Sequence, residues 1–405
     1  MKSYPSYKDS GVEWIGEIPN HWDTSKIGRH FELGRGRVIS NIEIQDNIGE
    51  YPVYSSQTKN DGVFGKINSY DFDGEYVIWT TDGVYSGTVS YRNGKFNTTN
   101  VCGMMSPKNI PIHLPYIPYL LNLGTKYYVR LDINPKLMNN MMSDIPFSIP
   151  PLPEQTQIVS FLDTKTKKID ELIEKTKQKI KLLKEKRTSL INHCVTKGLN
   201  PNVEMKDSGV EWIGEIPKDW GIIKGKYILK ILTGNYPKDL KENLTGISFF
   251  KVDDLNNTKQ NYFIDSSQLV VKEDENLNPL PKNIILFPKR GMTIFTNKVV
   301  ISKVRSYIDP NLMGVRIFDN SDIKFVLLCI KNRGLSDICD SSTIPQINNK
   351  HIYPLLFPFP QLLEQTQIVE YLDEQTQKID STIEKETQRI ELLKEYRQSL
   401  ISEVV

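Results

Sequence analysis

The sequence predicts a mixed α/β (α+β) protein with two globular segments separated by two long, antiparallel coiled-coil helices in a pseudo-twofold arrangement. Two observations support this prediction. First, the twelve residues KDSGVEWIGEIP occur twice, at 8–19 and at 206–217, and a tryptophan stands three residues beyond each copy. Second, each copy is followed by a variable segment and then by a stretch, 154–197 or 364–405, without proline or glycine. A repeat of this length indicates duplicated structural units.

The two stretches without proline or glycine are copies of one another at a constant offset of 210 residues. They share the sequences EQTQIV, KID, LLKE and SLI, which begin at positions 154, 168, 182 and 189 of the first copy. The box KDSGVEWIGEIP repeats at an offset of 198 instead, so the two variable segments differ in length. We therefore expect four parts, with globular segments at 1–153 and 200–363 and helices at 154–199 and 364–405.

Both stretches carry an apolar repeat of seven residues, which is typical of a coiled coil. Gly198, with Pro201 just beyond it, stands where a helix-ending glycine belongs. The residues expected at the helix–helix contact recur every seven positions and are Leu162, Ile169, Thr176, Leu183, Leu190, Leu372, Ile379, Glu386, Leu393 and Leu400. The alternative is a solvated single helix whose apolar stripe packs against its own domain.

The two helices carry opposite net charge, which favours pairing with each other over self-association. Residues 154–197 contain eleven Lys and Arg against six Asp and Glu, whereas residues 364–405 contain five against ten. Because a whole globular segment connects the helices, we expect an antiparallel pair in which Thr176 lies near Glu386. By the pseudo-symmetry, Val405 should lie near residues 1–9, which would make the chain a nearly closed ring.

The two variable segments, which follow Trp22 and Trp220, have the signature of strands and hairpins, because β-branched and aromatic runs alternate with Gly, Asn and Asp. Their loops contain Gln, Arg and Lys, which hydrogen-bond base edges and phosphates, although each residue alone also fits an ordinary surface position. The candidate DNA-binding residues are Ser55, Ser56, Gln57, Lys59, Thr81, Asp82, Tyr85, Arg92, Lys251, Asp253, Lys289, Arg290, Lys298, Lys303 and Arg305.

The composition argues against several other classes of protein. The chain has 405 residues, a formal net charge of +2, and four cysteines without a CxxC pair. No apolar run approaches the ~20 residues needed to cross a bilayer, and the polar start has no secretory signal. The histidines form no cluster at metal-ligand spacing. We expect a protein of the reducing cytoplasm, without a membrane span or a metal site.

The duplicated box, the PLPEQ entry into the first long helix and the pattern KID…LLKExRxSLI strongly resemble the specificity subunits of type I restriction–modification systems. The motifs cover nearly the whole chain and occur in the order that this family shows. They lie at 8–22, 134–199, 206–220 and 345–401.

The resemblance implies that each variable segment is a target recognition domain, with an α/β fold, that reads one half of a split double-stranded DNA sequence. The paired helices would set the unread spacer and dock two methyltransferase subunits, which restriction and translocation subunits would join. S-adenosylmethionine, ATP and Mg would bind to those partners, so this chain would hold no cofactor and carry no catalytic residue. The repeated box is expected to be a structural junction. The second helix entry should be less rigid, because Pro151 and Pro153 are replaced by Gln361 and Leu363.

An enzyme and a purely structural adaptor are the alternative readings. An amino-methyltransferase needs a [Asp/Asn/Ser]-Pro-Pro-aromatic loop, but Pro135 is followed by Lys136 and Pro310 by Asn311. A GxxxxGK[ST] phosphate loop is absent from the sequence, so ATP would have no cradle. A coiled-coil adaptor with two protein-binding heads would protect no DNA in a footprint, whereas a split-site reader should protect two patches.

Overall fold

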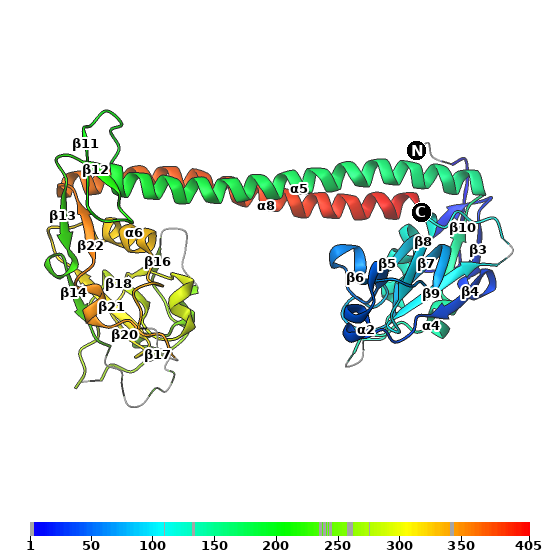
Figure 1. Ribbon diagram of the computed structural model, residues 1–405, viewed down its shortest axis with the longest axis horizontal. Coiled ribbons are helices and arrows are strands. Elements are labelled where there is room, and N and C mark those ends of the chain that lie inside the picture. Colours follow the sequence, from blue (N-terminus) through cyan, green and yellow to red (C-terminus); the bar gives the residue numbers. More distant parts are fainter. Residues whose placement is uncertain are drawn as a thin grey trace. The chain divides into compact units, whose positions relative to one another are not determined.

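The computed structural model describes residues 4–108, 110–131, 134–234, 237, 240, 242, 245–256, 262–274, 276–340 and 344–405. The chain forms two compact units: unit 1 comprises Met1–Lys175 and Arg389–Val405, and unit 2 comprises Thr176–Gln388. Each unit contains one globular part together with segments of both long helices (Figure 1).

The globular part of unit 1 is built on a six-stranded sheet with the order β4-β9-β7-β8-β5-β6. Its strands are β4 (Phe31–Arg35), β5 (Ile48–Tyr54), β6 (Val63–Ile67), β7 (Phe72–Thr80), β8 (Val89–Thr98) and β9 (Cys102–Pro107). Neighbouring strands pair antiparallel except β5 and β8, which pair parallel. The helix α3 (Tyr116–Gly124) contacts β8, and Trp79, Phe96 and Tyr116 are almost fully buried in this core.

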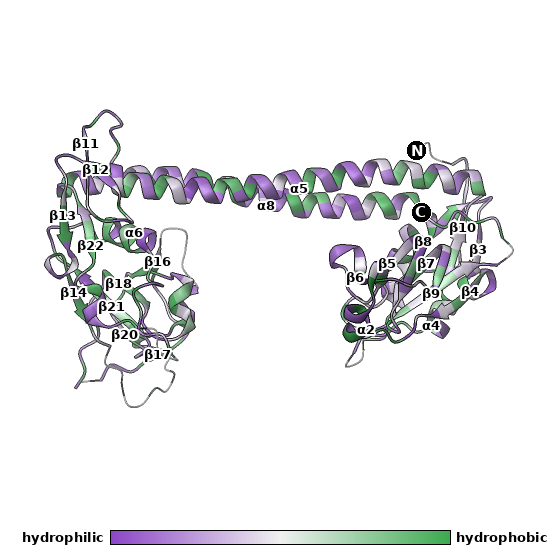
Figure 2. Ribbon diagram, viewed as in Figure 1, coloured by the Kyte–Doolittle hydropathy of each residue, from purple (hydrophilic) through white to green (hydrophobic). Residues whose placement is uncertain are grey.

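The globular part of unit 2 contains a five-stranded sheet with the order β14-β21-β18-β19-β16 and a three-stranded sheet with the order β17-β15-β20. The strands are β14 (Leu229–Leu232), β15 (Ile247–Phe250), β16 (Phe263–Ile264), β17 (Val270–Val271), β18 (Ile284–Pro288), β19 (Val300–Ser302), β20 (Ser306–Ile308) and β21 (Leu312–Ile317). The helix α6 (Ile323–Arg333) contacts β18 and β19, and all residues of β18 are buried. Figure 2 shows the apolar character of these strands.

Short helices connect the strands in both units. They are α1 (Ile27–His30), α2 (Asn41–Asp46), α4 (Asn139–Asp144) and α7 (Asn349–Ile352), with the 3-10 turns η1 (Lys59–Gly62), η2 (Thr125–Tyr127), η3 (Gly225–Tyr227), η4 (Asp253–Asn256) and η5 (Met292–Thr296).

Each copy of the repeated box folds as a small antiparallel hairpin. The first hairpin joins β1 (Tyr7–Asp9) to β2 (Glu17–Pro19), and the second joins β11 (Met205–Asp207) to β12 (Glu215–Pro217). The second glycine of each box adopts a left-handed backbone, with φ +71° at Gly16 and +68° at Gly214, which glycine reaches without steric cost.

The strand after each hairpin pairs with the strand that leads into the next long helix. In unit 1, β3 (Asp23–Lys26) pairs with β10 (Pro146–Ile149), and in unit 2, β13 (Gly221–Lys224) pairs with β22 (Leu356–Phe359). The repeated frame of the sequence is therefore a repeated piece of structure at the start of each helix.

The two long helices are α5 (Leu152–Lys197) and α8 (Leu362–Val404). Both begin two residues before the predicted positions, and α5 includes Pro153 because the first backbone N–H groups of a helix need no intrahelical partner. The helices begin at equivalent residues, so the loss of both prolines in the second copy does not move the start. Gly198 ends α5 with φ +72°, as predicted.

The helices pair in an antiparallel sense within unit 2. Lys179 lies 2.5 Å from Glu386 and Arg187 lies 2.9 Å from Asp380, so residue numbers rise along one helix as they fall along the other. Lys179 is one turn from Thr176, which confirms that Thr176 lies near Glu386. Both residues are buried, at 4% and 8% exposure.

The predicted contact residues form one stripe along each helix. All ten are buried or half-buried, whereas the adjacent Leu182 and Leu392 are 63% and 64% exposed. In unit 1 the end of α8 contacts the globular part, because the carbonyl of Val405 accepts hydrogen bonds from Ser148 at 3.2 Å and Tyr116 at 3.4 Å. The end of α8 therefore lies against the first globular part. The expected position of Val405 beside residues 1–9 stays a prediction, and residues 1–3 lie outside the described ranges.

Candidate nucleic-acid interface

A loop at 55–62 joins β5 to β6 in unit 1 and carries four of the predicted contact residues. Its ends meet through a 3.1 Å hydrogen bond from the Ser55 amide to the Gly62 carbonyl. Asn60 and Asp61 both have φ +52°, a conformation that short polar side chains tolerate better than most. The turn leaves Lys59 exposed, while Ser55, Ser56 and Gln57 are half-buried.

Arg92, on the neighbouring strand β8, holds this loop in place. Its Nη1 donates to Asp61 Oδ2 at 3.0 Å and its Nη2 donates to the Asp61 carbonyl at 2.7 Å. The guanidinium also lies 4.1 Å from the centroid of the Tyr54 ring, and the side chain is 11% exposed. Arg92 therefore acts as a support for the loop, because its charge is already matched inside the protein.

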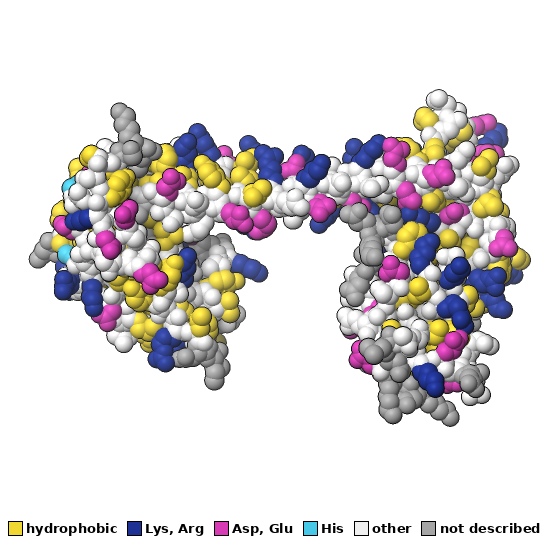
Figure 3. Space-filling model, turned by 180° about the vertical axis from the view of Figure 1, so that it is seen from behind, with side chains coloured by type: hydrophobic (Ala, Val, Ile, Leu, Met, Phe, Trp, Pro, Cys, Tyr) yellow, Lys and Arg dark blue, Asp and Glu magenta, His cyan; other side chains and the backbone are white. Residues whose placement is uncertain are grey.

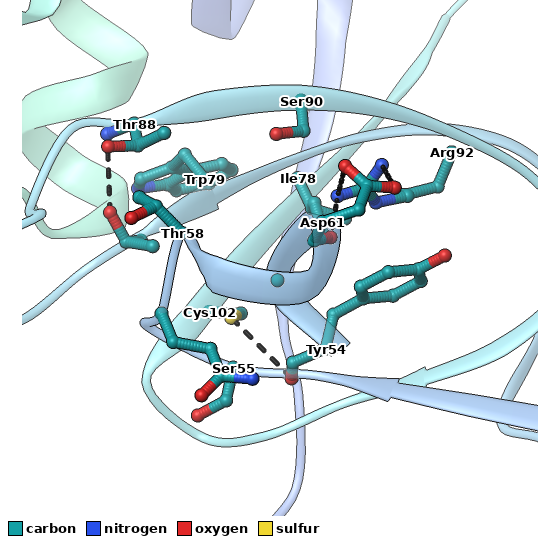
Figure 4. A pocket seen from close by; sticks show the side chains of 13 residues that line it. Tyr54, Ser55, Thr58, Asp61, Ile78, Trp79, Thr88, Ser90, Arg92 and Cys102 are labelled. Atoms are coloured by element: carbon teal, nitrogen blue, oxygen red, sulfur yellow. Dashed lines mark hydrogen bonds and ion pairs between the residues drawn. The ribbon is translucent and has the colours of Figure 1, made fainter. Parts of the chain in front are cut away.

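A pocket of about 100 Å³ lies between this loop and the sheet. It brings together three predicted residues, Ser55, Gln57 and Arg92, with Trp79 and Thr80 at the end of β7. Figure 4 shows Arg92 and Asp61 joined beside the Tyr54 ring. The pocket thus has an aromatic wall and several hydrogen-bonding groups, but its volume is below the roughly 300 Å³ at which ligand pockets begin.

The second predicted loop of unit 1 lies at 81–88, between β7 and β8. Thr81 has no exposed surface, so it supports the loop and does not contact a ligand in this conformation. Asp82 is 21% exposed and lies 3.3 Å from Arg35 and 3.8 Å from Lys136. At the tip, Tyr85 is 45% exposed, which leaves its ring available for contact.

Unit 2 contains the same loop with different side chains. In unit 1, residues 81–83 bond to residues 135–137 through backbone hydrogen bonds of 2.9 and 3.0 Å. In unit 2, residues 289–291 bond to residues 345–347 through two bonds of 2.8 Å. The sequence is Thr-Asp-Gly in the first loop and Lys-Arg-Gly in the second, so the backbone is retained while the charge is reversed. Lys289 is half-buried and Arg290 is exposed.

The turn that follows β15 carries two further predicted residues, Lys251 and Asp253, which are both exposed. The neighbouring Asp254 organises this turn, since it is 5% exposed and accepts a 2.7 Å hydrogen bond from the Lys251 amide. Asp254 also accepts from Ser267 and from the amide of Gln268, both at 3.2 Å. Asp253 is therefore placed for contact by a neighbour whose own carboxylate is used internally.

The remaining predicted residues of unit 2 lie around β19, and two of them, Lys303 and Arg305, are already engaged. The ammonium of Lys303 lies 4.0 Å from the Phe263 ring, Arg305 lies 2.8 Å from Glu273, and Lys298 is half-buried. The Arg305–Glu273 ion pair is at the surface and contributes little to stability, so exchange of Glu273 for another anion costs little. On the face seen in Figure 3, basic side chains gather over the globular part of unit 2.

Reasoning from the sequence missed the acidic and basic partners that hold these loops. Asp61, Arg35 and Lys136 are joined to predicted residues only through the fold, and no spacing rule connects them. Asp254 had a local signal, because it stands next to Asp253 at the end of an apolar run.

Two further observations concern metal binding and membrane spans. The described residues include no group of three or more His, Cys, Asp and Glu side chains placed to hold a metal ion. Within the described ranges, none of the helices has the length and apolar character of a membrane span.

Both halves of the chain match one family model. The type I restriction modification DNA specificity domain matches residues 19–182 and again residues 217–394. The chain therefore belongs to the family of type I restriction–modification DNA specificity proteins. In such a protein the two domains recognise DNA, and the fold seen here has two such domains linked by long helices.

Relatives of this chain include specificity subunits of Mycoplasma pneumoniae. A putative type I specificity subunit is 41% identical over 190 residues, which cover 45% of this chain and 79% of the relative. The specificity subunit of the type I restriction enzyme MpnII is 40% identical over 190 residues, which cover 45% of this chain and 57% of that protein.

Two solved structures share the fold at 14% sequence identity. A chain from a type I restriction–modification system, solved to explain complex assembly and conformational transition, has a TM-score of 0.74 and covers 96% of this chain and 98% of its own length. The HsdS subunit from Thermoanaerobacter tengcongensis has a TM-score of 0.55 and covers 96% of this chain and 97% of its own length.

Proposed function

We propose that each globular part reads one half of a bipartite DNA site and that the unit 1 and unit 2 loops at 81–88 and 289–297 are equivalent reading elements. The observation that supports this most directly is the shared backbone of these loops. The same pair of main-chain hydrogen bonds holds Thr-Asp-Gly in one domain and Lys-Arg-Gly in the other. A retained scaffold with exchanged polar side chains is what two readers of different sequences require.

The residues proposed to contact bases or phosphates are those that the loops leave accessible. Arg290 suits a bidentate contact with guanine, since its guanidinium is exposed at the start of the loop. Tyr85 and Lys59 in unit 1, and Lys251 and Lys289 in unit 2, are the next candidates. Thr81 and Arg92 support these contacts from behind.

The helices α5 and α8 are proposed to set the spacer between the half-sites and to dock two methyltransferase subunits in the cytoplasm. Linking two recognition domains makes the second contact an intramolecular event, which raises affinity for a split site. The chain is proposed to be non-catalytic. S-adenosylmethionine, ATP and Mg would bind to the methyltransferase and restriction subunits.

The experiment is to determine the methylated motif in cells that carry the complete system, by sequencing modified bases in genomic DNA. Arg290→Asp should change the motif in one half-site and leave the other half unchanged, with a loss of ~1–3 kcal/mol in discrimination at one base pair. Lys230→Thr is the matched control, because Lys230 is an exposed lysine on β14 of the same unit. A change in both half-sites from Arg290→Asp, or an unchanged motif, would contradict the proposal.

A further inference from the structure

A groove of about 530 Å³ lies in unit 1 where α3 meets segments of α5 and α8. Two prolines and two aliphatic side chains give it an apolar wall, and Tyr119, Asp163 and Arg397 form its polar end. The Tyr119 hydroxyl donates to Asp163 Oδ1 at 2.6 Å. Burial, together with that carboxylate, raises the pKa of Tyr119 to about 12, so the phenol stays protonated at neutral pH.

Arg397 has a donor that faces no partner among the residues that the structure describes. Its Nε and Nη2 donate to the carboxylate of Asp170 at 3.0 and 3.3 Å. These bonds fix the plane of the guanidinium at the edge of the groove and leave Nη1 available. The side chain is 36% exposed.

The equivalent place in unit 2 is filled by an aromatic side chain. The helix repeat relates Arg397 to Arg187 and Asp170 to Asp380, and Arg187 Nε lies 2.9 Å from Asp380 Oδ1. There, Arg187 Nη1 donates to the hydroxyl of Tyr262 at 2.9 Å. The Arg187 guanidinium also lies 5.6 Å from the centroid of that ring.

The helix α3 of unit 1 corresponds to the helix α6 of unit 2. A glutamine in the first turns of each long helix, Gln155 or Gln365, accepts a 2.8 Å hydrogen bond from the backbone just before α3 or α6. In unit 2 the ammonium of Lys331, on α6, lies 5.0 Å from the centroid of the Tyr262 ring, so α6 contacts this tyrosine. Tyr262 itself is held by a 2.7 Å bond from the Ile301 amide to its carbonyl.

We propose that the unit 1 groove binds a tyrosine side chain of a partner protein in the way that unit 2 binds its own Tyr262. The ring lies between α3 and α8, and its hydroxyl oxygen accepts a hydrogen bond from Arg397 Nη1. A tyrosine suits the groove because its ring covers the apolar wall while its hydroxyl reaches the arginine, and Tyr is enriched at protein interfaces for this combination. This site goes beyond the proposed DNA reading and does not depend on it.

The test is a titration of the full-length protein, ¹³C-labelled at isoleucine methyl groups, with N-acetyl-L-tyrosinamide. Ile401 lines the groove, so its methyl signal should shift and saturate. N-acetyl-L-phenylalaninamide should bind about fivefold more weakly, because it lacks the hydroxyl that accepts from Arg397. N-acetyl-L-leucinamide should leave the Ile401 signal unchanged.

The variant Gln398→Trp fills the groove from an exposed position and should abolish the shift, whereas the control Ser399→Trp, also exposed but outside the groove, should preserve it. The proposal is overturned by an Ile401 signal that does not respond to the tyrosine probe, or that responds equally to the leucine probe. A shift that persists in Gln398→Trp overturns it as well. None of these outcomes bears on the methylated motif, so the groove and the DNA-reading proposal fail separately.

Discussion

The indole nitrogen of Trp220 donates a 3.0 Å hydrogen bond to Glu364 Oε2, and the same bond, also of 3.0 Å, joins Trp22 to Glu154. The tryptophan follows the repeated box and the glutamate lies in the first turn of the long helix. A carboxylate is favoured there by the helix dipole as well as by the indole. The box is therefore tied to the start of a helix in both units, which agrees with a structural junction.

The two junction glutamates should respond oppositely to acid. Burial tends to raise the pKa of both carboxyls. At Glu154, hydrogen bonds from Trp22, His21 and Tyr4 outweigh it and hold the pKa below its ordinary value. At Glu364, burial prevails and raises the pKa. Glu154 thus stabilises the fold above the ordinary carboxyl range and loses that contribution as pH falls through its lowered pKa. Ionised Glu364 opposes folding, and that cost disappears as pH falls through its raised pKa.

We expect Glu154→Gln to lower the free energy of unfolding at pH 7 by ~1–2 kcal/mol, because a charged acceptor of three hydrogen bonds is lost. Glu364→Gln keeps an acceptor for the indole and should change it by less than ~0.5 kcal/mol, or increase it. Denaturant unfolding at pH 7 and pH 4 measures both variants. The Glu154→Gln deficit should shrink at pH 4, and an equal deficit for the two variants would refute the asymmetry.

The Arg187–Asp380 ion pair should couple the long helices measurably. Both side chains are largely buried, at 21% and 22% exposure, so solvent screens them weakly. A double-mutant cycle with Arg187→Gln and Asp380→Asn should give a coupling energy of ~1–3 kcal/mol. The control cycle uses Lys181 and Glu185, which are 79% and 59% exposed on α5 and should give less than ~0.5 kcal/mol. Equal coupling in both cycles would show that burial does not strengthen the pair.

Glu386, at 8% exposure in the helix contact, is expected to reduce stability relative to an apolar residue. Its carboxylate lies 2.5 Å from Lys179, whose side chain is 54% exposed. Removing one partner of an ion pair is costly when the other charge stays buried, but Lys179 is exposed and water can solvate it, so Glu386→Leu should raise the free energy of unfolding by ~1 kcal/mol. The exposed Glu384→Leu on the same helix should not. A decrease in Glu386→Leu would show that the charge is required for pairing.

The long helices were predictable because their evidence is local and repeated. A seven-residue apolar period, opposite charge and Gly198 together predict two paired helices, and Lys179 with Glu386 confirms the sense of pairing. The strand pairing was not predictable, since β5 lies beside β8 in parallel while three segments separate them in sequence.

In the candidate site, too, local features were predictable from the sequence, whereas contacts between distant residues were not. The loops at 55–62 and 81–88 were located from their turn residues. The fold alone decides that Arg92 turns toward Asp61 and that Thr81 is buried, because those contacts join residues far apart along the chain. The equivalence of 81–83 and 289–291 also required the backbone bonds, since the side chains differ.

The cysteines provide a final test of the packing in both units. Cys102, Cys194 and Cys329 are buried, and burial raises the pKa of the Cys102 and Cys194 thiols to about 11. Burial also raises the pKa of Cys329, whereas Cys339 is half-buried. Because the thiolate is the reactive form, an aromatic disulfide reagent at pH 8 should modify one thiol rapidly in the native protein and four in denaturant. Cys339→Ser should remove the rapid phase, and a rapid thiol that remains in that variant would show that the packing around one of the three buried cysteines opens on the time scale of the reaction.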